Sequence, residues 1–259
     1  MSRIPESMLN IEQRVFEKFS GEQVTEDMLE EASKLFSENY GIWSVGAPRM
    51  MGGFARTGER VLLSKETLRK HYLTPGTSSY VKVTVNGQLA GHAFACRWTV
   101  GMIFRRKTIC WITQLVVHKD YRRRGLATGL LNQIKQGSDD DVFGIMSSHP
   151  AACLAAAKAF GSSINTISLK FIKDNVELIL KASPVMYVRN ARLQGSLFDS
   201  QDTGSVVSSA DTRFFVDHDE PLEALAEVQE SAGWPLGELL DGHEFILILQ
   251  AKRSSSVEV

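Results

Sequence analysis

The most constraining feature of this sequence is an apolar segment that leads through an arginine- and glycine-containing turn into an amphipathic helix. It spans residues 114–131, QLVVHKDYRRRGLATGLL. The first turn of a helix leaves backbone N–H groups without partners, and the helix dipole adds partial positive charge there. Gly125 and Ala127 keep side-chain bulk away from those donors. A strand, a basic turn and a helix N-terminus in this order predict a phosphate-binding site.

Two other phosphate motifs do not fit this segment. The dinucleotide fingerprint needs three glycines on a strand-to-helix turn and an acidic residue about 20 positions later, and the spacing here differs. The nucleoside-triphosphate loop ends in Gly-Lys-Ser or Gly-Lys-Thr, which this chain lacks. A basic turn that only caps a helix is the alternative that stays open.

The order Arg122-x-x-Gly125-x-Ala127, after a strand that ends in Leu115-x-Val117, resembles motif A of the GNAT superfamily of acyl-CoA-dependent N-acetyltransferases. In that family the turn binds the coenzyme A pyrophosphate, and a bulge splays the preceding strand, whose backbone pairs with the pantetheine. The resemblance covers about residues 15–190 and implies acetyl-CoA (coenzyme A) as co-substrate. The implied cofactor-binding residues are Leu115, Val116, Val117, Arg122, Arg123, Arg124, Gly125, Leu126, Ala127, Thr128 and His149.

His149 has two interpretations. It stands where many GNAT proteins carry an asparagine that hydrogen-bonds the pantetheine, and it also precedes Pro150, the expected first residue of a helix. A histidine that caps this helix is therefore an equal alternative to a coenzyme contact.

The remaining pattern predicts an α/β fold with a GNAT-like mixed, mostly antiparallel central sheet flanked by helices. Strands are expected near 13–20, 79–85, 88–98, 107–117, 142–147 and 245–249, and helices begin near residues 25, 64, 126, 150 and 221. The apolar stretches of 165–188 fit either strands or a strand with a helix. Residues 45–59 and 194–212 are expected to be loops.

We expect a single GNAT-like domain over residues 13–250. Its core covers about 15–190, the C-terminal extension 194–250 packs on this core, and residues 251–259 form a disordered tail.

The composition excludes several classes of protein. A formal net charge of −1 over 259 residues argues against nucleic acid and anionic membranes as partners. No apolar run approaches the ~20 residues that span a bilayer, and the three cysteines suggest no disulfide framework. We therefore expect a soluble, intracellular, cytoplasmic protein. No histidine and carboxylate pattern has metal-ligand spacing, so no metal is expected.

The chain departs from the family at two positions used for proton transfer. Many relatives carry a glutamate on the central strand, where this chain has Gln114, and an amide is no base. Many also carry a tyrosine on the later helix, a register that falls here on Ala155 or Ala156. Either a residue outside the core motif supplies the base, or substrate binding and ordered water suffice.

The catalytic candidates are therefore Gln114 itself and the pair Asp217 and His218. Carboxylates on both sides of His218 are expected to raise its pKa. The alternative for this segment is a turn in which Asp219 or Glu220 caps the following helix. His243 and Glu244, before the last strand, are further possibilities.

The acceptor candidates lie in the segment that covers the acceptor site of GNAT proteins: Tyr40, Trp43, Arg49 and Phe54. Their aromatic and cationic groups suit an amine that carries a carboxylate or a ring, whereas packing is the alternative for Tyr40 and Trp43.

We expect transfer of an acetyl group from acetyl-CoA to a primary amine, by direct attack in a ternary complex. The acceptor is a small-molecule amine, an amino acid or a lysine side chain. The alternative is a non-catalytic acyl-CoA-binding protein with the GNAT fold, which the absent glutamate and tyrosine favour. The sequence leaves the acceptor, the acyl length and the oligomeric state open.

Overall fold

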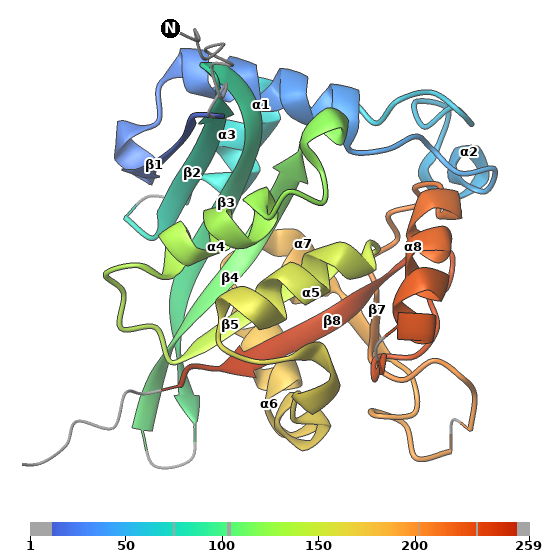
Figure 1. The fold of residues 1–259 in the computed structure, drawn as a ribbon. Helices are drawn as coiled ribbons and strands as arrows, with labels where there is room; N and C mark the ends of the chain where they lie inside the picture. The colour runs from blue at the N-terminus through green and yellow to red at the C-terminus, as the bar shows by residue number, and fades with distance from the viewer. Residues whose placement is uncertain (1–11, 75, 103–104, 202, 232, 253–259) are drawn as a thin grey trace, which may run out of the picture.

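The computed structural model describes residues 12–74, 76–102, 105–201, 203–231 and 233–252. These residues form one eight-stranded sheet in the order β1-β2-β3-β4-β5-β8-β7-β6, with helices on both faces (Figure 1). The strands are β1 (Arg14–Ser20), β2 (Ser78–Val85), β3 (Gln88–Met102), β4 (Arg105–Val117), β5 (Val142–Ser147), β6 (Arg192–Gln194), β7 (Ser209–Asp211) and β8 (His243–Gln250). The helices are α1 (Glu26–Asn39), α2 (Ala47–Met51), α3 (Lys65–Tyr72), α4 (Leu126–Lys135), α5 (Pro150–Ala159), α6 (Leu169–Lys181), α7 (Met186–Asn190) and α8 (Asp219–Ser231).

The sheet is antiparallel at every strand pair except the central one. β4 and β5 run parallel, and they pair only from Ile109–Ile112 to Val142–Ile145. On the far side of β5, the C-terminal strand β8 pairs antiparallel along the whole of it. This arrangement confirms the predicted α/β fold with a mixed, mostly antiparallel sheet.

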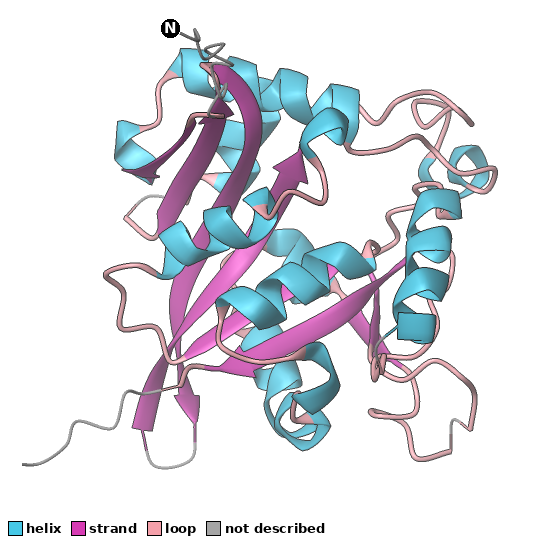
Figure 2. Ribbon diagram, viewed as in Figure 1, coloured by secondary structure: helices cyan, strands magenta, loops and turns pink. Residues whose placement is uncertain are grey.

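The helices form two layers on the sheet (Figure 2). Helices α4 and α5 lie on one face, with α4 across β1 to β3 and α5 on β5 and β8. Helices α1, α3, α6 and α7 cover the opposite face, and α8 lies beside α5 at the edge that holds β7. The C-terminal extension therefore contributes strands to the same sheet as the N-terminal part.

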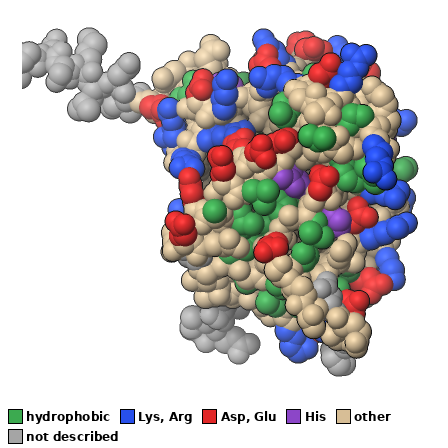
Figure 3. All heavy atoms as spheres, turned by 90° about the vertical axis from the view of Figure 1, so that its right-hand side faces the viewer, with side chains coloured by type: hydrophobic (Ala, Val, Ile, Leu, Met, Phe, Trp, Pro, Cys, Tyr) green, Lys and Arg blue, Asp and Glu red, His purple; other side chains and the backbone are tan. Residues whose placement is uncertain are grey.

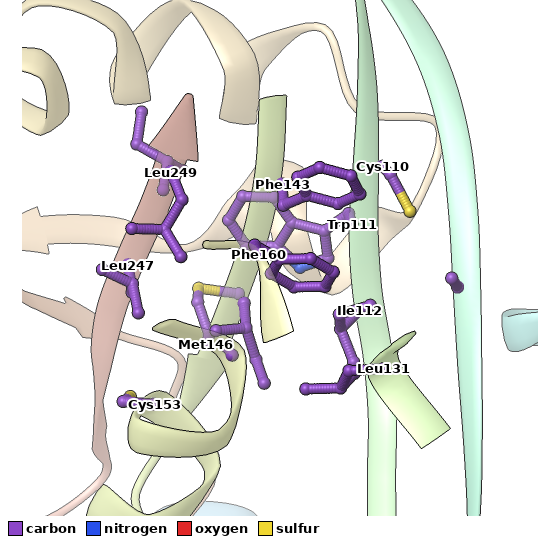
Figure 4. Close-up of a cluster of buried hydrophobic side chains, with 14 of the residues drawn as sticks. Cys110, Trp111, Ile112, Leu131, Phe143, Met146, Cys153, Phe160, Leu247 and Leu249 are labelled. Carbon is purple, nitrogen blue, oxygen red and sulfur yellow. The ribbon is translucent and has the colours of Figure 1, made fainter. Parts of the chain in front are cut away.

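Aromatic side chains fill the core where β4 meets β5 (Figure 4). The rings of Phe143 and Phe160 stack with centroids 4.0 Å apart, which attaches the end of α5 to the sheet. On β4, Trp111 is fully buried against Gly144 of β5, because the parallel register places the two opposite each other. Burial of side chains of this size stabilises the fold by about 2 kcal/mol each.

Residues 165–188 are a correction to the sequence analysis, because they form helices α6 and α7 and no strand. Ile172, Val176 and Ile179 are fully buried and recur at helical spacing. The hydroxyl of Ser168 accepts the N–H of Phe171 and caps the first turn. The apolar runs that suggested strands are thus the inner face of an amphipathic helix.

Two predicted loops also contain regular structure. The segment 45–59 includes the short helix α2. The segment 194–212 includes β7, and its first residue Ser209 and the preceding Ser208 are fully buried. Their hydroxyls donate to carbonyl oxygens of β8, with 2.9 Å between Ser208 Oγ and the Ile246 oxygen. Small polar residues here belong to a buried strand, because each hydroxyl finds a backbone partner.

The last described residues lie beside the sheet. The N–H of Ala251 donates to the carbonyl of Asp141 at 2.9 Å. The remainder of the expected C-terminal tail, 253–259, lies outside the described residues. Within the described part of the chain, no helix has the length and apolarity needed to cross a bilayer.

The contact between Trp111 and Gly144 gives a first prediction. A Cβ atom at residue 144 would lie 2.2 Å from the Trp111 ring, so Gly144→Ala should lower the free energy of unfolding by about 3 kcal/mol. Gly41→Ala is the control, since its added methyl meets no atom within 4 Å. Urea denaturation monitored by tryptophan fluorescence measures both. Equal stability of the two variants would contradict the packing described here.

Candidate active site

The sheet opens between β4 and β5 beyond the pair Ile112 and Ile145. On β4, Ile112 pairs with Ala95 and Gln114 pairs with Phe94, so Thr113 is the extra residue of a β-bulge. The bulge that the GNAT resemblance implies is therefore present. The hydroxyl of Tyr187, on α7, donates to the Thr113 carbonyl at 2.8 Å and holds the bulge from one face of the sheet.

A cavity of about 820 Å³ occupies this opening. Ala152 of α5 contributes to its wall on one face of the sheet, while α1, α3 and α7 line it on the other face. The cavity therefore extends through the sheet, between the diverging strands. Its lining includes Phe36, Tyr40, Tyr72, Ile112, Thr113, Gln114, Leu115, Ile145, Met146, Ser147, Tyr187, Asp211, Thr212, Phe214 and Glu244.

Glu244, at the start of β8, is the carboxylate held inside this cavity. The residue is 9% exposed, and burial raises the pKa of its carboxyl to about 7, while a hydrogen bond from Thr212 acts in the opposite direction. Burial also raises the pKa of Tyr72 to about 12, and the pKa values of Tyr40 and Tyr187 rise well above 10. Glu244 is thus a lining group placed to exchange a proton near pH 7.

Gln114 is held by a buried histidine behind it. The side-chain oxygen of Gln114 lies 2.7 Å from Nε2 of His92. Burial lowers the pKa of His92 to about 4, so the ring is neutral and donates this hydrogen bond. The amide nitrogen of Gln114 is buried and forms no hydrogen bond with another described residue. Gln114 lines the cavity as a fixed amide and carries no proton-accepting group.

The turn before α4 has the backbone that the sequence predicts. Gly125 adopts φ 81° and Arg123 φ 61°, both in the left-handed region. No side chain caps this helix, so the amides of its first turn, at residues 126–128, face outward without a cap. A Cβ atom at Gly125 would meet no atom within 4 Å, which shows open space in front of those amides.

Each arginine of the turn is paired with a carboxylate. Arg122 binds Glu220 of α8 and also donates to the carbonyl oxygens of Asn39 and Val117, at 2.7 and 3.3 Å. Arg123 lies 2.9 Å from Glu227 of α8. The third, Arg124, lies 3.1 Å from Glu12. The positive charge beside the turn is therefore balanced, and two of the three balancing carboxylates belong to α8.

His149 caps helix α5. Its Nδ1 atom accepts the N–H of Ala151 at 3.2 Å, and its Nε2 atom lies 3.6 Å from Glu220. Burial lowers the pKa of the imidazole, an effect that Glu220 opposes. The capping alternative is thus confirmed, and a contact with pantetheine stays a prediction. Ala155 and Ala156, farther along α5, are both buried.

Asp217 and His218 form the turn that precedes α8. A carboxylate oxygen of Asp217 accepts the N–H of Asp219 at 3.0 Å, and the His218 carbonyl accepts the N–H of Leu222 at 2.8 Å. The expected rise in the pKa of His218 is wrong, because burial lowers it despite nearby Asp241 and Asp217. Neither Asp217 nor His218 is among the described residues that line the cavity.

The four acceptor candidates separate into two groups. Tyr40 lines the cavity and stacks on Phe36, with ring centroids 4.3 Å apart. Trp43 is buried and lies edge-on to Phe54. Arg49 and Phe54 are exposed and, among the described residues, do not line the cavity. On the side of the molecule where α2 and α8 lie, hydrophobic side chains gather between charged ones (Figure 3).

Among the described residues, no cluster of three or more His, Cys, Asp or Glu side chains is arranged to hold a metal ion. From the sequence, Glu244 was only a further possibility, and Tyr72 and Tyr187 were not predicted as lining residues. The sequence feature that could have indicated Glu244 is its charge directly before the apolar run 245–249.

Burial of Glu244 predicts a pH-dependent gain of stability in Glu244→Gln. Since the folded-state pKa is raised from 4.5 to about 7, the wild type loses stability as the pH rises through this interval. Glutamine carries no such penalty. The free energy of unfolding of the variant should therefore exceed that of the wild type by up to about 3 kcal/mol at pH 8, and the two should be equal at pH 4. Denaturation at both pH values measures this. A gain at neither pH, or an equal gain in the exposed control Glu238→Gln, would contradict it.

Comparisons with known proteins concern the central part of the chain. Residues 48–161 match the model of the Acetyltransferase (GNAT) family, and no curated protein sequence matches. Among solved structures, the ribosomal-protein-S18-alanine N-acetyltransferase from Escherichia coli is 15% identical over 57% of this chain and 77% of that chain, with a TM-score of 0.37. A possible acetyltransferase from Clostridium difficile 630 is 20% identical over 49% of this chain and 72% of that chain, with a TM-score of 0.32. An aminoglycoside acetyltransferase from an uncultured soil metagenomic sample, in complex with sisomicin, is 15% identical over 48% and 68% of the two chains, with a TM-score of 0.31. The match of residues 48–161 to the GNAT acetyltransferase family confirms the resemblance inferred from the sequence.

Proposed function

We propose that this protein transfers an acetyl group from acetyl-CoA to a primary amine by direct attack in a ternary complex. The observation that carries the proposal is the cavity between β4 and β5, which joins the two faces of the sheet. A thioester that enters from the face of α4 and α5 can meet an amine on the face of α1, α3 and α7.

The residues around the opening suit coenzyme A. The uncapped amides of residues 126–128 and the open space at Gly125 suit its pyrophosphate. Beyond Ile112, β4 has lost β5 as a partner, so the backbone edge of Leu115–Val117 on that side is available to the pantetheine amides. These contacts involve backbone groups, which explains why no particular side chains are required there.

Glu244 supplies the base that the central strand lacks. The ammonium group of the acceptor transfers a proton to its carboxylate, which the pKa of about 7 permits near neutral pH. The neutral amine nitrogen then bonds to the carbonyl carbon of the thioester and loses a second proton as the amide forms. The carbon–sulfur bond breaks with its electron pair on sulfur, and the departing thiolate takes up this second proton and leaves as free thiol. Gln114, fixed by His92, lines the same space as an uncharged donor.

The alternative is a protein that binds acyl-CoA without transferring the group. Gln114 in place of a glutamate and Ala155 and Ala156 in place of a tyrosine favour this alternative. The buried Glu244 favours catalysis, because an unpaired carboxylate is costly to hold inside a cavity that only binds a ligand.

Release of free thiol from acetyl-CoA, measured across a panel of amines, tests the proposal. With Glu244 as base, kcat/KM should rise about tenfold per pH unit below pH 7 and level off above it. Glu244→Gln should lose this inflection and about 100-fold or more in kcat. Asp211→Asn is the control for a change of charge in the same cavity. An unchanged profile in Glu244→Gln would assign the base elsewhere, and binding without release with any amine would favour the non-catalytic alternative.

The turn before α4 gives a prediction for coenzyme binding. Gly125→Val should abolish the binding of coenzyme A, because the added side chain occupies the space in front of the first-turn amides. Gly137→Val is a matched control, since Gly137 at the other end of the same helix also has a positive φ, 70°, and open surroundings. Calorimetric titration compares the two. Micromolar affinity in Gly125→Val would contradict the assigned pyrophosphate site.

The carboxylates of α8 give a prediction of the opposite sign. Glu220 and Glu227 hold Arg122 and Arg123 and place negative charge beside the proposed pyrophosphate site. Glu220→Gln with Glu227→Gln should therefore bind coenzyme A about fivefold more tightly in low salt, and this gain should shrink in 0.5 M salt. In the described part of the chain, Glu223 and Glu230 of the same helix form no ion pair, so their double substitution is the control. Unchanged or weaker binding would show that the arginine pairs do not compete with the coenzyme.

A further inference from the structure

We infer that the acceptor is a primary amine on an apolar, preferentially aromatic body, with no carboxylate on the carbon that carries the amine. The inference rests on the proposed function and specifies the chemistry of its acceptor. Two observations carry it: the aromatic wall of the cavity and the placement of charge within it.

The wall that faces the acceptor side is built from aromatic rings on separate elements. Phe36 and Tyr40 come from α1, Tyr72 from α3 and Tyr187 from α7, and Phe214 precedes α8 in the chain. The rings contact one another, with centroids 5.9 Å apart for Tyr40 and Phe214 and 6.2 Å apart for Tyr72 and Tyr187. A ring on the acceptor gains apolar burial and edge or face contacts here, and the volume of about 820 Å³ suits a whole small molecule.

The inner part of the cavity is acidic. Glu244 is buried, and the cationic residues Arg192 and Arg213 that also line the cavity are exposed, which places them at its opening. Asp211 is half-buried and accepts the backbone N–H of Arg213. An ammonium group can thus pair with Glu244 and lie against the tyrosine rings.

A free α-amino acid does not fit this arrangement. Its ammonium group next to Glu244 would bring its own carboxylate to the same buried place, whereas the two arginines of the described lining, Arg192 and Arg213, are exposed. Two carboxylates in one desolvated site repel each other strongly. An anionic group far from the amine could still reach Arg192 or Arg213, so the inference concerns the amine end of the acceptor.

Calorimetric titration with three related amines tests the inference without requiring turnover. At pH 8, the wild type should bind 2-phenylethylamine about 100-fold more tightly than phenylalanine, which adds only the carboxylate. It should also bind 2-phenylethylamine at least about tenfold more tightly than ethylamine, which lacks the ring. Glu244→Gln should lose most of the discrimination against phenylalanine, whereas Asp211→Asn should keep it.

The outcomes separate the inference from the proposed function. Binding of phenylalanine or ethylamine as tight as that of 2-phenylethylamine, or no binding of 2-phenylethylamine, overturns the inference. Thiol release measured with the same amines then tests the function by itself. Preferred acetylation of amino acids or lysine peptides would support the function and overturn the inference, whereas selective binding of 2-phenylethylamine without any release would support the inference and overturn the function.

Discussion

The structure depends on the loss of pairing between β4 and β5 after four residue pairs. Parallel strands normally continue their hydrogen bonds as far as both strands run, but the bulge at Thr113 turns β4 away. The divergence leaves one backbone edge of β4 available and opens a cavity through the sheet. Trp111 over Gly144 and the Tyr187 hydroxyl on the Thr113 carbonyl hold the two strands at the point where they separate. The phosphate turn, the cavity and the proposed base all take their positions from this point.

The C-terminal extension completes the site that the core leaves unfinished. Strand β8 pairs with β5 and places Glu244 in the cavity, although Glu244 is far from the bulge in the sequence. Helix α8 contributes Glu220 and Glu227 to the arginines of the turn. The proposed base and the carboxylates beside the proposed coenzyme site thus both come from the last quarter of the chain. The carboxylate that destabilises the fold above pH 7 is also the group that can accept a proton there.

The sequence predicted the parts of the site that are local. Residues 114–131 specify strand, turn and helix through apolar spacing and Gly125, and Asn86-Gly87 specifies the hairpin between β2 and β3, where both residues have positive φ. Contacts between distant segments were not predictable, such as the pairs of Arg122 with Glu220 and of Arg123 with Glu227 on α8. The pKa of His218 was predicted in the wrong direction because the neighbouring carboxylates are visible in the sequence and the burial is not. The prediction of a strand within residues 165–188 was wrong, because short apolar runs fit a strand as well as the inner face of a helix.

The most direct test of this account is a crystal structure of the protein with coenzyme A. We predict the diphosphate on the amides of residues 126–128, the pantetheine along Leu115–Val117 between β4 and β5, and the thiol at the cavity that holds Glu244. Coenzyme A bound elsewhere, or β4 and β5 paired along their full length in the complex, would contradict it.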